Sequence, residues 1–274
     1  MLARWQVLEM TRTTLIFLHA LGASRREWEQ VIALLPEYDC IALDLPGFGD
    51  RLLFGMTDVA QLTDWAADEI AKRQLAKCVL VGHSMGGKIV TLVAARAVSG
   101  ETALESVRGV VLVAGSPLAP EPMDERRRAE MIDWFAEGQP TAEDAVTFVD
   151  GNAANPLPEV SRGQAVADML RSDPAAWLAW LEHGSREDWS DEVGQIDLPA
   201  LIVAGAQDED LGEAAQRRLN LPHYQNARIA LVAEAAHLIP YEQPKALAAL
   251  IEGHAAFATA TPSALTDLSQ PTQS

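Results

Sequence analysis

Ser84 lies at the centre of the pattern Gly82-x-Ser84-x-Gly86, whose residue types and spacing suit nucleophilic chemistry. A short apolar run, residues 79–81, precedes the pattern, and residues with helical spacing follow it at once. The serine is therefore predicted on a tight turn between a strand and a helix, where the small glycines let its oxygen project above the sheet edge. A hydroxyl is a poor nucleophile until a base takes its proton, so the pattern predicts catalytic partners elsewhere in the chain.

The same stretch also fits a different chemistry, because Gly82 to Gly87 followed by Lys88 has the spacing of a phosphate-binding loop. That loop requires a serine or threonine after the lysine to hold magnesium, and here the next residue is Ile89. The mismatch argues against a phosphate site. A purely structural turn is the other alternative, and the presence of catalytic partners decides between it and a nucleophile.

Polar residues follow five of the predicted strands: His19, Asp44, Ser84, Asp208 and His237. In an open α/β sheet, reactive groups collect in the loops at the carboxyl ends of the strands. Ser84, Asp208 and His237 stand in the order serine, acid, histidine that such an enzyme uses. His237 would take the serine proton, and Asp208 would fix the tautomer of the imidazole. A surface histidine and a helix-capping aspartate are the alternatives, but their joint order and placement favour a catalytic triad.

The hydrophobic pattern predicts elements that bring these residues to one edge of a sheet. Continuous apolar runs indicate buried parallel strands over residues 14–18, 38–45, 79–81, 107–114, 198–204 and 227–233. Amphipathic segments indicate helices over residues 25–35, 58–74, 86–98, 211–219 and 241–257. The alternation predicts an α/β fold with a mostly parallel, doubly wound sheet. Residues 1–10 could add one edge strand.

The alternation stops between residues 117 and 195, where helical spacing is expected over 124–137, 141–149, 160–170 and 174–183. Large apolar side chains are frequent there, and they could form the interior of a helical subdomain, line a pocket from above, or both. We expect residues 1–116 and 196–258 to form the core and residues 117–195 an inserted all-helical cap. Residues 259–274 are rich in Ser, Thr, Pro and Gln and are expected to be a flexible tail.

Charge and composition limit the partners and the compartment. The net charge of −18 over 274 residues argues against nucleic acid and anionic membranes. No residues have the spacing of metal ligands, and no cofactor is expected. Cys40 and Cys78 fall in predicted buried strands, which is typical of core residues in a reducing compartment. The apolar run after Thr11 resembles a signal peptide only superficially, since it is short and contains His19. We expect a cytoplasmic protein, as a monomer or a homodimer.

Together, these motifs resemble the α/β-hydrolase superfamily, in its esterase-like branch with a helical cap. The resemblance covers about residues 13–257 and rests on His19-x-x-Gly22, Asp44-Leu-Pro-Gly-Phe-Gly49, Gly82-His-Ser-Met-Gly-Gly87, Gly205-x-x-Asp208 and Ala236-His237. It implies that Asp208, rather than Asp210, is the triad acid. It also implies that the backbone amides of Leu21 and Met85 form an oxyanion hole. The chain departs from the family pattern at Ala20, where glycine is usual.

A serine nucleophile argues against the branches of this superfamily that use an aspartate, and it favours acyl transfer to water through an acyl-serine intermediate. The main hypothesis is a hydrolase of small to medium, fairly apolar carboxylic esters. The tentative pocket residues are His19, Phe48, Trp134, Met169 and Trp177.

Several alternatives remain open. A thioesterase, a lactonase and a hydrolase of carbon–carbon bonds share the same fold, and the last usually needs basic residues to hold a carboxylate. The cap arginines that could do so are Arg126, Arg127, Arg128, Arg162 and Arg171. Arginines on predicted helices more often form a solvated face. An alternative of another class is a ligand sensor that binds, or slowly cleaves, a signal molecule.

Overall fold

A six-stranded parallel sheet forms the centre of the computed structural model, which describes residues 12–52 and 55–260. The strand order is β2-β1-β3-β4-β5-β6. The strands are β1 Thr14–Leu18, β2 Asp39–Leu43, β3 Cys78–His83, β4 Val107–Val113, β5 Ile196–Gly205 and β6 Tyr224–Val232. The predicted parallel α/β sheet is confirmed, and the edge strand expected within residues 1–10 lies outside the described residues. The chain order reverses between β1 and β3, which is where open sheets of this kind bind ligands.

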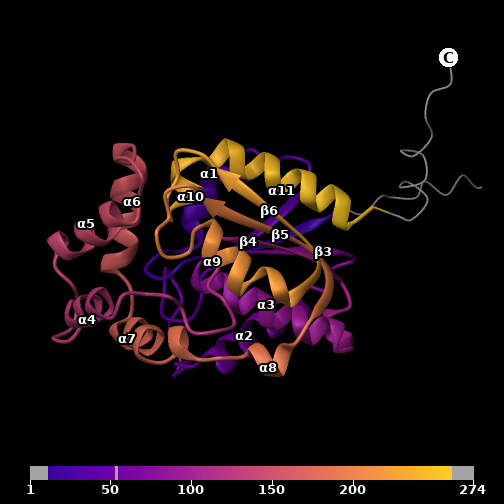
Figure 1. The fold of residues 1–274 in the computed structure, drawn as a ribbon, viewed down its shortest axis with the longest axis horizontal. Coiled ribbons are helices and arrows are strands. Elements are labelled where there is room, and N and C mark those ends of the chain that lie inside the picture. Colours follow the sequence, from indigo (N-terminus) through magenta and orange to yellow (C-terminus); the bar gives the residue numbers. More distant parts are fainter. Residues whose placement is uncertain (1–11, 53–54, 261–274) are drawn as a thin grey trace, which may run out of the picture.

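Helices cover both faces of the sheet because its strands are apolar on both sides. In β1, Leu15 and Phe17 belong to one buried cluster, whereas Ile16 and Leu18 belong to the other. The first cluster packs beneath α1 Glu29–Ile32 and α11 Pro244–Ala258, and the second beneath α2 Val59–Ala71 and α3 Met85–Val98. Figure 1 shows these two helical layers on opposite sides of the strands. The shorter elements are η2 Thr102–Leu104, α9 Glu213–Leu219, η4 Leu221–His223 and α10 Ile239–Glu242.

The first predicted helix, residues 25–35, is instead a 3₁₀ turn, η1 Arg25–Trp28, followed by α1. Ser24 caps this turn by accepting a hydrogen bond from the amide of Arg26 at 3.2 Å. The tighter turn leaves both Glu27 and Trp28 buried against the sheet. A carboxylate is therefore enclosed where a regular amphipathic helix would have exposed it.

The residues between β4 and β5 are helical, and their separation from the core as a cap over residues 117–195 stays a prediction. It contains α4 Glu125–Asp133, α5 Ala142–Gly151, α6 Glu159–Leu170, α7 Pro174–Glu182, η3 Gly184–Arg186 and α8 Ser190–Val193. None of residues 117–195, all of which are described, lies in a strand. Helices α4 to α7 gather at one end of the molecule, beside the sheet (Figure 1). Among the described helices, none combines the length and the apolar character needed to cross a membrane.

Aromatic side chains hold the cap helices together. Trp177 is fully buried, stacks on Phe135 at 4.5 Å between ring centroids, and meets Phe148 edge-on at 5.2 Å. Its indole N–H donates to the carbonyl of Met131 at 2.8 Å. These contacts join α4, α5 and α7, so most of the large apolar residues form the interior of the insertion.

Two buried charged groups tie the cap to the core. Asp168, on α6, accepts hydrogen bonds from Ser24 Oγ at 2.8 Å and from Arg26 Nε at 3.2 Å. Lys88, on α3, donates to the carbonyls of Gly184 and Glu187, each at 3.0 Å. Burial lowers the pKa of Lys88, although nearby carboxylates partly offset this. The lysine that a phosphate loop would direct at its ligand is therefore bound to the cap backbone instead.

The expected solvated face of cap arginines is only partly observed. Arg128 is buried and donates to the carbonyl of Leu181 at 2.9 Å and to Ser185 Oγ. Arg162 instead forms a partly exposed pair with Asp150 at 2.6 Å. The buried position of Arg128 arises because α4 packs directly on the end of α7.

Candidate active site

Ser84 occupies the sharp turn that the sequence pattern predicts, between β3 and α3. Its backbone has φ 48° and ψ −117°, a conformation that side chains rarely adopt and that costs of order 1–3 kcal/mol. The glycines allow this turn for a steric reason. A Cβ on Gly82 would lie 2.4 Å from the carbonyl oxygen of Gly86, and one on Gly86 would lie 2.5 Å from that of Leu18. The amide of Ser84 donates to Val113 at 3.0 Å, which fixes the turn to the sheet.

His237 and Asp208 form the acid–base pair expected of a triad. Asp208 Oδ2 lies 2.8 Å from His237 Nδ1, and Oδ1 accepts from the amides of Asp210 at 3.1 Å and Leu211 at 2.9 Å. An ionised carboxylate only accepts hydrogen bonds, so Nδ1 carries the proton and Nε2 is left as the acceptor. The side chain of Asp210 points elsewhere, because it pairs with Arg127 at 2.6 Å.

The electrostatics of the pair suit a general base. Burial acts to lower the pKa of His237, but the charge and hydrogen bond of Asp208, with a contribution from Glu121, hold that pKa above its ordinary value. Burial acts to raise the pKa of Asp208, and His237 with the two loop amides outweighs it, so that this pKa is lowered. An ionised carboxylate in this position can stabilise an imidazolium at His237, as a triad requires.

The backbone amides of Leu21 and Met85 are the predicted oxyanion donors. Leu21 lines the same cavity as Ser84, and Met85 is the first residue of α3, where the helix dipole favours negative charge. Within residues 12–52 and 55–260, neither amide donates to another backbone or side-chain acceptor. Both are thus available to a ligand, and their role as oxyanion donors stays a prediction.

Ser84, Asp208 and His237 line one small cavity under the cap. Its free volume is about 60 Å³, well below the roughly 300 Å³ typical of ligand pockets. The other lining residues are Ala20, Leu21, Glu121, Pro122, Met123, Arg127, Met131, Phe148, Asn152, Trp180, Asp210, Leu211 and Leu238. Substrates larger than a few heavy atoms therefore require displacement of cap side chains.

The five tentative pocket residues do not line this cavity. His19 Nε2 accepts from the amide of Leu45 at 2.9 Å, so Nδ1 must be the donor to the carbonyl of Ala20 at 2.8 Å. This buried histidine thus joins the loop after β1 to the loop after β2, and burial lowers its pKa. Phe48 packs edge-on against His19 and lines a neighbouring smaller hollow.

The other three tentative residues lie in the cap itself. Met169 and Trp177 are fully buried in its interior, and Trp134 packs edge-on against Phe148. The cap aromatics that do line the serine cavity are Phe148 and Trp180. Helical spacing identified the apolar side of each cap helix, but it could not tell which apolar residue faces another helix and which faces the serine.

Other polar side chains also line the cavity, and sequence reasoning missed Glu121 among them. Glu121 is buried, accepts a hydrogen bond from Ser116 Oγ, and has its pKa raised by burial despite that bond and the nearby Lys88. Arg127 donates to Asn152 Oδ1 at 2.8 Å and to Asp210. Glu121 stands in a loop without periodicity, so no sequence signal marked it, whereas Arg127 was among the cap arginines considered for a carboxylate.

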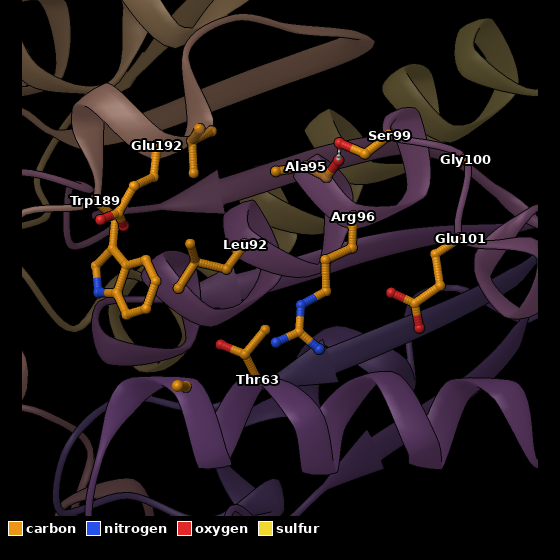
Figure 2. A pocket seen from close by; sticks show the side chains of 11 residues that line it. Thr63, Leu92, Ala95, Arg96, Ser99, Gly100, Glu101, Trp189 and Glu192 are labelled. Atoms are coloured by element: carbon orange, nitrogen blue, oxygen red, sulfur yellow. Dashed lines mark hydrogen bonds between the residues drawn. The ribbon is translucent and has the colours of Figure 1, made fainter.

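A larger hollow, of about 530 Å³, lies between α2, α3 and α8 and contains no triad residue. Figure 2 shows its side chains, with Trp189 at one end and Arg96 and Glu101 at the other. Arg96 pairs with Asp64 at 2.6 Å, and Ser99 Oγ donates to the carbonyl of Ala95 at 2.8 Å. Two of its polar side chains thus already have partners within the protein, and the predicted nucleophile Ser84 lines the other cavity.

Two bacterial proteins illustrate what this chain resembles in sequence over most of its length. A 2-succinyl-6-hydroxy-2,4-cyclohexadiene-1-carboxylate synthase from Enterobacter sp. (strain 638) is 27% identical, over 86% of this chain and 89% of that protein. A pimeloyl-[acyl-carrier protein] methyl ester esterase from Neisseria meningitidis is also 27% identical, over 85% of this chain and 89% of the relative.

Solved structures with the same fold include an esterase from Exiguobacterium antarcticum, with a TM-score of 0.79, 16% identity, and coverage of 89% of this chain and 92% of the other. The carboxylesterase CesB from Bacillus subtilis gives a TM-score of 0.74 at 20% identity, covering 89% and 83%. The sequence model of the Alpha/beta hydrolase family matches residues 15–250. This protein belongs to the alpha/beta hydrolase family.

Proposed function

We propose that this protein is a serine hydrolase that cleaves carboxylic esters through an acyl-serine intermediate. The observation that carries the proposal is that Ser84, Asp208 and His237 line one cavity. Asp208 is bound to Nδ1 of His237, which leaves Nε2 as the proton acceptor. The methyl ester esterase among the relatives, and the esterases that share the fold, support the same reaction class.

The proposed reaction follows from the groups present. Ser84 Oγ attacks the ester carbonyl carbon while His237 Nε2 takes its proton, and Asp208 stabilises the resulting imidazolium. The amides of Leu21 and Met85 hold the oxyanion, and each such donor is worth about 3–4 kcal/mol. The alcohol leaves with the proton from His237, and a water activated by the same histidine then releases the acid.

The residues that line the Ser84 cavity support a small to medium, fairly apolar substrate. The apolar residues Leu21, Met131, Phe148 and Trp180 suit an uncharged acyl or alcohol portion. The small free volume favours short chains unless the cap moves.

A second candidate has one specific observation in its favour. Arg127 lies at the cavity with its guanidinium directed at Asp210 and Asn152, so an anionic group of a substrate could exchange for Asp210. Several relatives are named as synthases of a cyclohexadiene carboxylate. Carbon–carbon bond cleavage on a carboxylate substrate is therefore the alternative to ester hydrolysis.

The test is a substrate panel run on the wild type and on Ser84→Ala together. It contains p-nitrophenyl esters from acetate to octanoate, acyl-CoA thioesters, lactones, and the substrate of the synthase named above. We expect turnover of short-chain esters by the wild type and its loss in Ser84→Ala, with the far-ultraviolet circular dichroism unchanged. Undiminished turnover by Ser84→Ala would overturn the proposal. A single burst of labelling without steady turnover would instead indicate a ligand sensor.

A further inference from the structure

We propose that Glu27 and His83 are a pair of positioning residues that hold the backbone of His237 and the loop before Leu21 in place relative to Ser84. This role rests on the proposed function, because positioning matters only if these groups react. Neither side chain is exposed to the cavity, so neither touches substrate. They act through the residues that do.

Two hydrogen bonds connect the pair to neighbouring loops, and a third joins its two members. His83 Nε2 lies 2.8 Å from the carbonyl oxygen of His237, and His83 Nδ1 lies 3.1 Å from Glu27 Oε2. The other oxygen of that carboxylate, Oε1, accepts from the amide of Ala20 at 3.2 Å. One chain of contacts thus runs from the loop after β6, through the end of β3, to the loop after β1.

The direction of these bonds follows from the groups involved. A backbone carbonyl can only accept, so His83 Nε2 carries a proton and donates to His237. Between Nδ1 and Glu27 one proton is shared, whether the pair is imidazolium and carboxylate or neutral imidazole and carboxylic acid. In both states the bond to His237 is the same. Both side chains are fully buried, so water cannot substitute for a lost partner.

The backbone of His237 is held on two sides. Its amide donates to the carbonyl of Asn152, in the cap, at 3.0 Å, and its carbonyl accepts from His83, in the core. The ring of His83 also packs between Trp28, edge-on at 6.2 Å, and the ring of His237 at 5.2 Å. If the bond from His83 is lost, the carbonyl of His237 loses its donor from the core. The residue is then held by the cap carbonyl of Asn152 and, through its ring, by Asp208, so its backbone and imidazole can shift.

The expected effect is on rate rather than on binding. A displacement of about 1 Å in a reacting group can cost about 100-fold in rate. A pair that acts only on the positions of His237 and Leu21 should therefore change kcat and leave KM nearly unaltered. Removing one member of a buried pair can cost about 3–5 kcal/mol of folding stability, so the readout of positioning is the rate of folded protein and not its stability.

Two isosteric changes at residue 83 separate positioning from general packing. In His83→Gln the amide nitrogen falls near the place of Nε2 and can still donate to His237. In His83→Asn the shorter amide reaches only toward Glu27. We expect kcat to fall about 10- to 100-fold in His83→Asn and to stay within about threefold in His83→Gln, with KM within about threefold in both. Equal losses in the two variants, or a wild-type kcat in His83→Asn, would overturn the proposal.

A second variant decides the matter if His83→Asn does not fold. Glu27→Gln keeps an acceptor for Ala20 and offers a donor to His83 Nδ1, which leaves Nε2–H directed at His237. We expect its kcat within about threefold of wild type. A loss of more than about tenfold in folded Glu27→Gln would contradict the role, because every positioning bond is conserved there.

The control is His254→Asn, which makes the same change as His83→Asn at another buried histidine. His254 lies on α11 against Gly109, near the start of β4 and at the opposite end of the strand from the Ser84 turn. Its kcat should equal that of wild type, and a loss matching His83→Asn would overturn the proposal.

A spectroscopic readout distinguishes failure of this inference from failure of the proposed function. The proton on His237 Nδ1, bound to Asp208, gives a downfield resonance in the proton spectrum that does not depend on any substrate. We expect it to persist in His83→Gln and to shift or broaden in His83→Asn. An unchanged resonance in His83→Asn would contradict positioning, even if the protein hydrolyses no ester.

Discussion

Asp208→Asn probes the triad through the hydrogen bonds of a single carboxylate. Asp208 Oδ1 accepts from the amides of Asp210 and Leu211, and Oδ2 faces His237 Nδ1. Asparagine has only one side-chain oxygen, and the two backbone donors require that oxygen at the Oδ1 position. Its NH₂ group must then face His237, whose Nδ1 becomes an acceptor. The proton therefore moves to Nε2, the nitrogen that has to accept the proton of Ser84.

The size of the effect follows from this change of tautomer. A triad whose histidine has the wrong tautomer loses about 10⁴ in kcat. At about 1.36 kcal/mol per factor of ten, that is about 5.5 kcal/mol of transition-state stabilisation. The assay is steady-state hydrolysis of the best p-nitrophenyl ester, with the tautomer followed by the ¹⁵N shifts of His237. The wild type should show a protonated Nδ1 and the variant a protonated Nε2.

Asp210→Asn is the matched control, because it makes the same change two residues away. Its carboxylate pairs with Arg127 at 2.6 Å, with both side chains about one third exposed. A partly solvated pair of this kind is worth about 1 kcal/mol or less, so kcat should stay within about tenfold. Activity of Asp208→Asn within about tenfold of wild type, or an equal loss in Asp210→Asn, would refute the assignment of Asp208 as the triad acid.

Three further results are expected. We expect kcat/KM to rise with pH through a pKa above about 6.5. His237 must be neutral to act as the base, and Asp208 raises the pKa of His237. A midpoint at or below about 6.5 would contradict this. Asp168→Ala should lower the free energy of unfolding in urea by about 2–3 kcal/mol, because a buried carboxylate bound to Ser24 and Arg26 is lost. The control, Asp150→Ala, removes a partly exposed carboxylate and should lower it by about 1 kcal/mol or less. In Gly205→Ala, the new Cβ would lie 1.9 Å from the carbonyl oxygen of Ala236, the residue before His237. We expect the free energy of unfolding to fall by at least about 1–3 kcal/mol in the same assay, and kcat to fall as well. A Gly205→Ala protein with wild-type stability and kcat would show that the loop can relax.

The sheet could be predicted because its central strands are nearly continuous apolar runs. A parallel strand is buried on both faces, and all five residues of β1 are buried. The strand-to-helix turn at Ser84 could also be predicted. Backbone atoms lie so close to Gly82 and Gly86 that only glycine fits there, and this requirement is visible in the sequence. The positions of Asp208 and His237 then followed from the rule that polar residues at strand ends share one edge.

The cap and the supporting groups could not be predicted in the same way. Helical spacing places Trp177 and Met169 on apolar faces, but which face meets the serine depends on how four short helices pack. The Glu27–His83 contact joins residues 56 positions apart and follows no periodic pattern. It depends on the 3₁₀ turn that directs Glu27 inward, and local propensity did not indicate that turn.

The most direct test of the central claim is to find the acyl group. The wild type is mixed with a p-nitrophenyl ester, quenched with acid during the first turnover, digested and examined by mass spectrometry. We expect the acyl mass on Ser84, and its absence in Ser84→Ala. An acyl group on another residue, or steady ester turnover by Ser84→Ala without any adduct, would contradict an acyl-serine mechanism at this site.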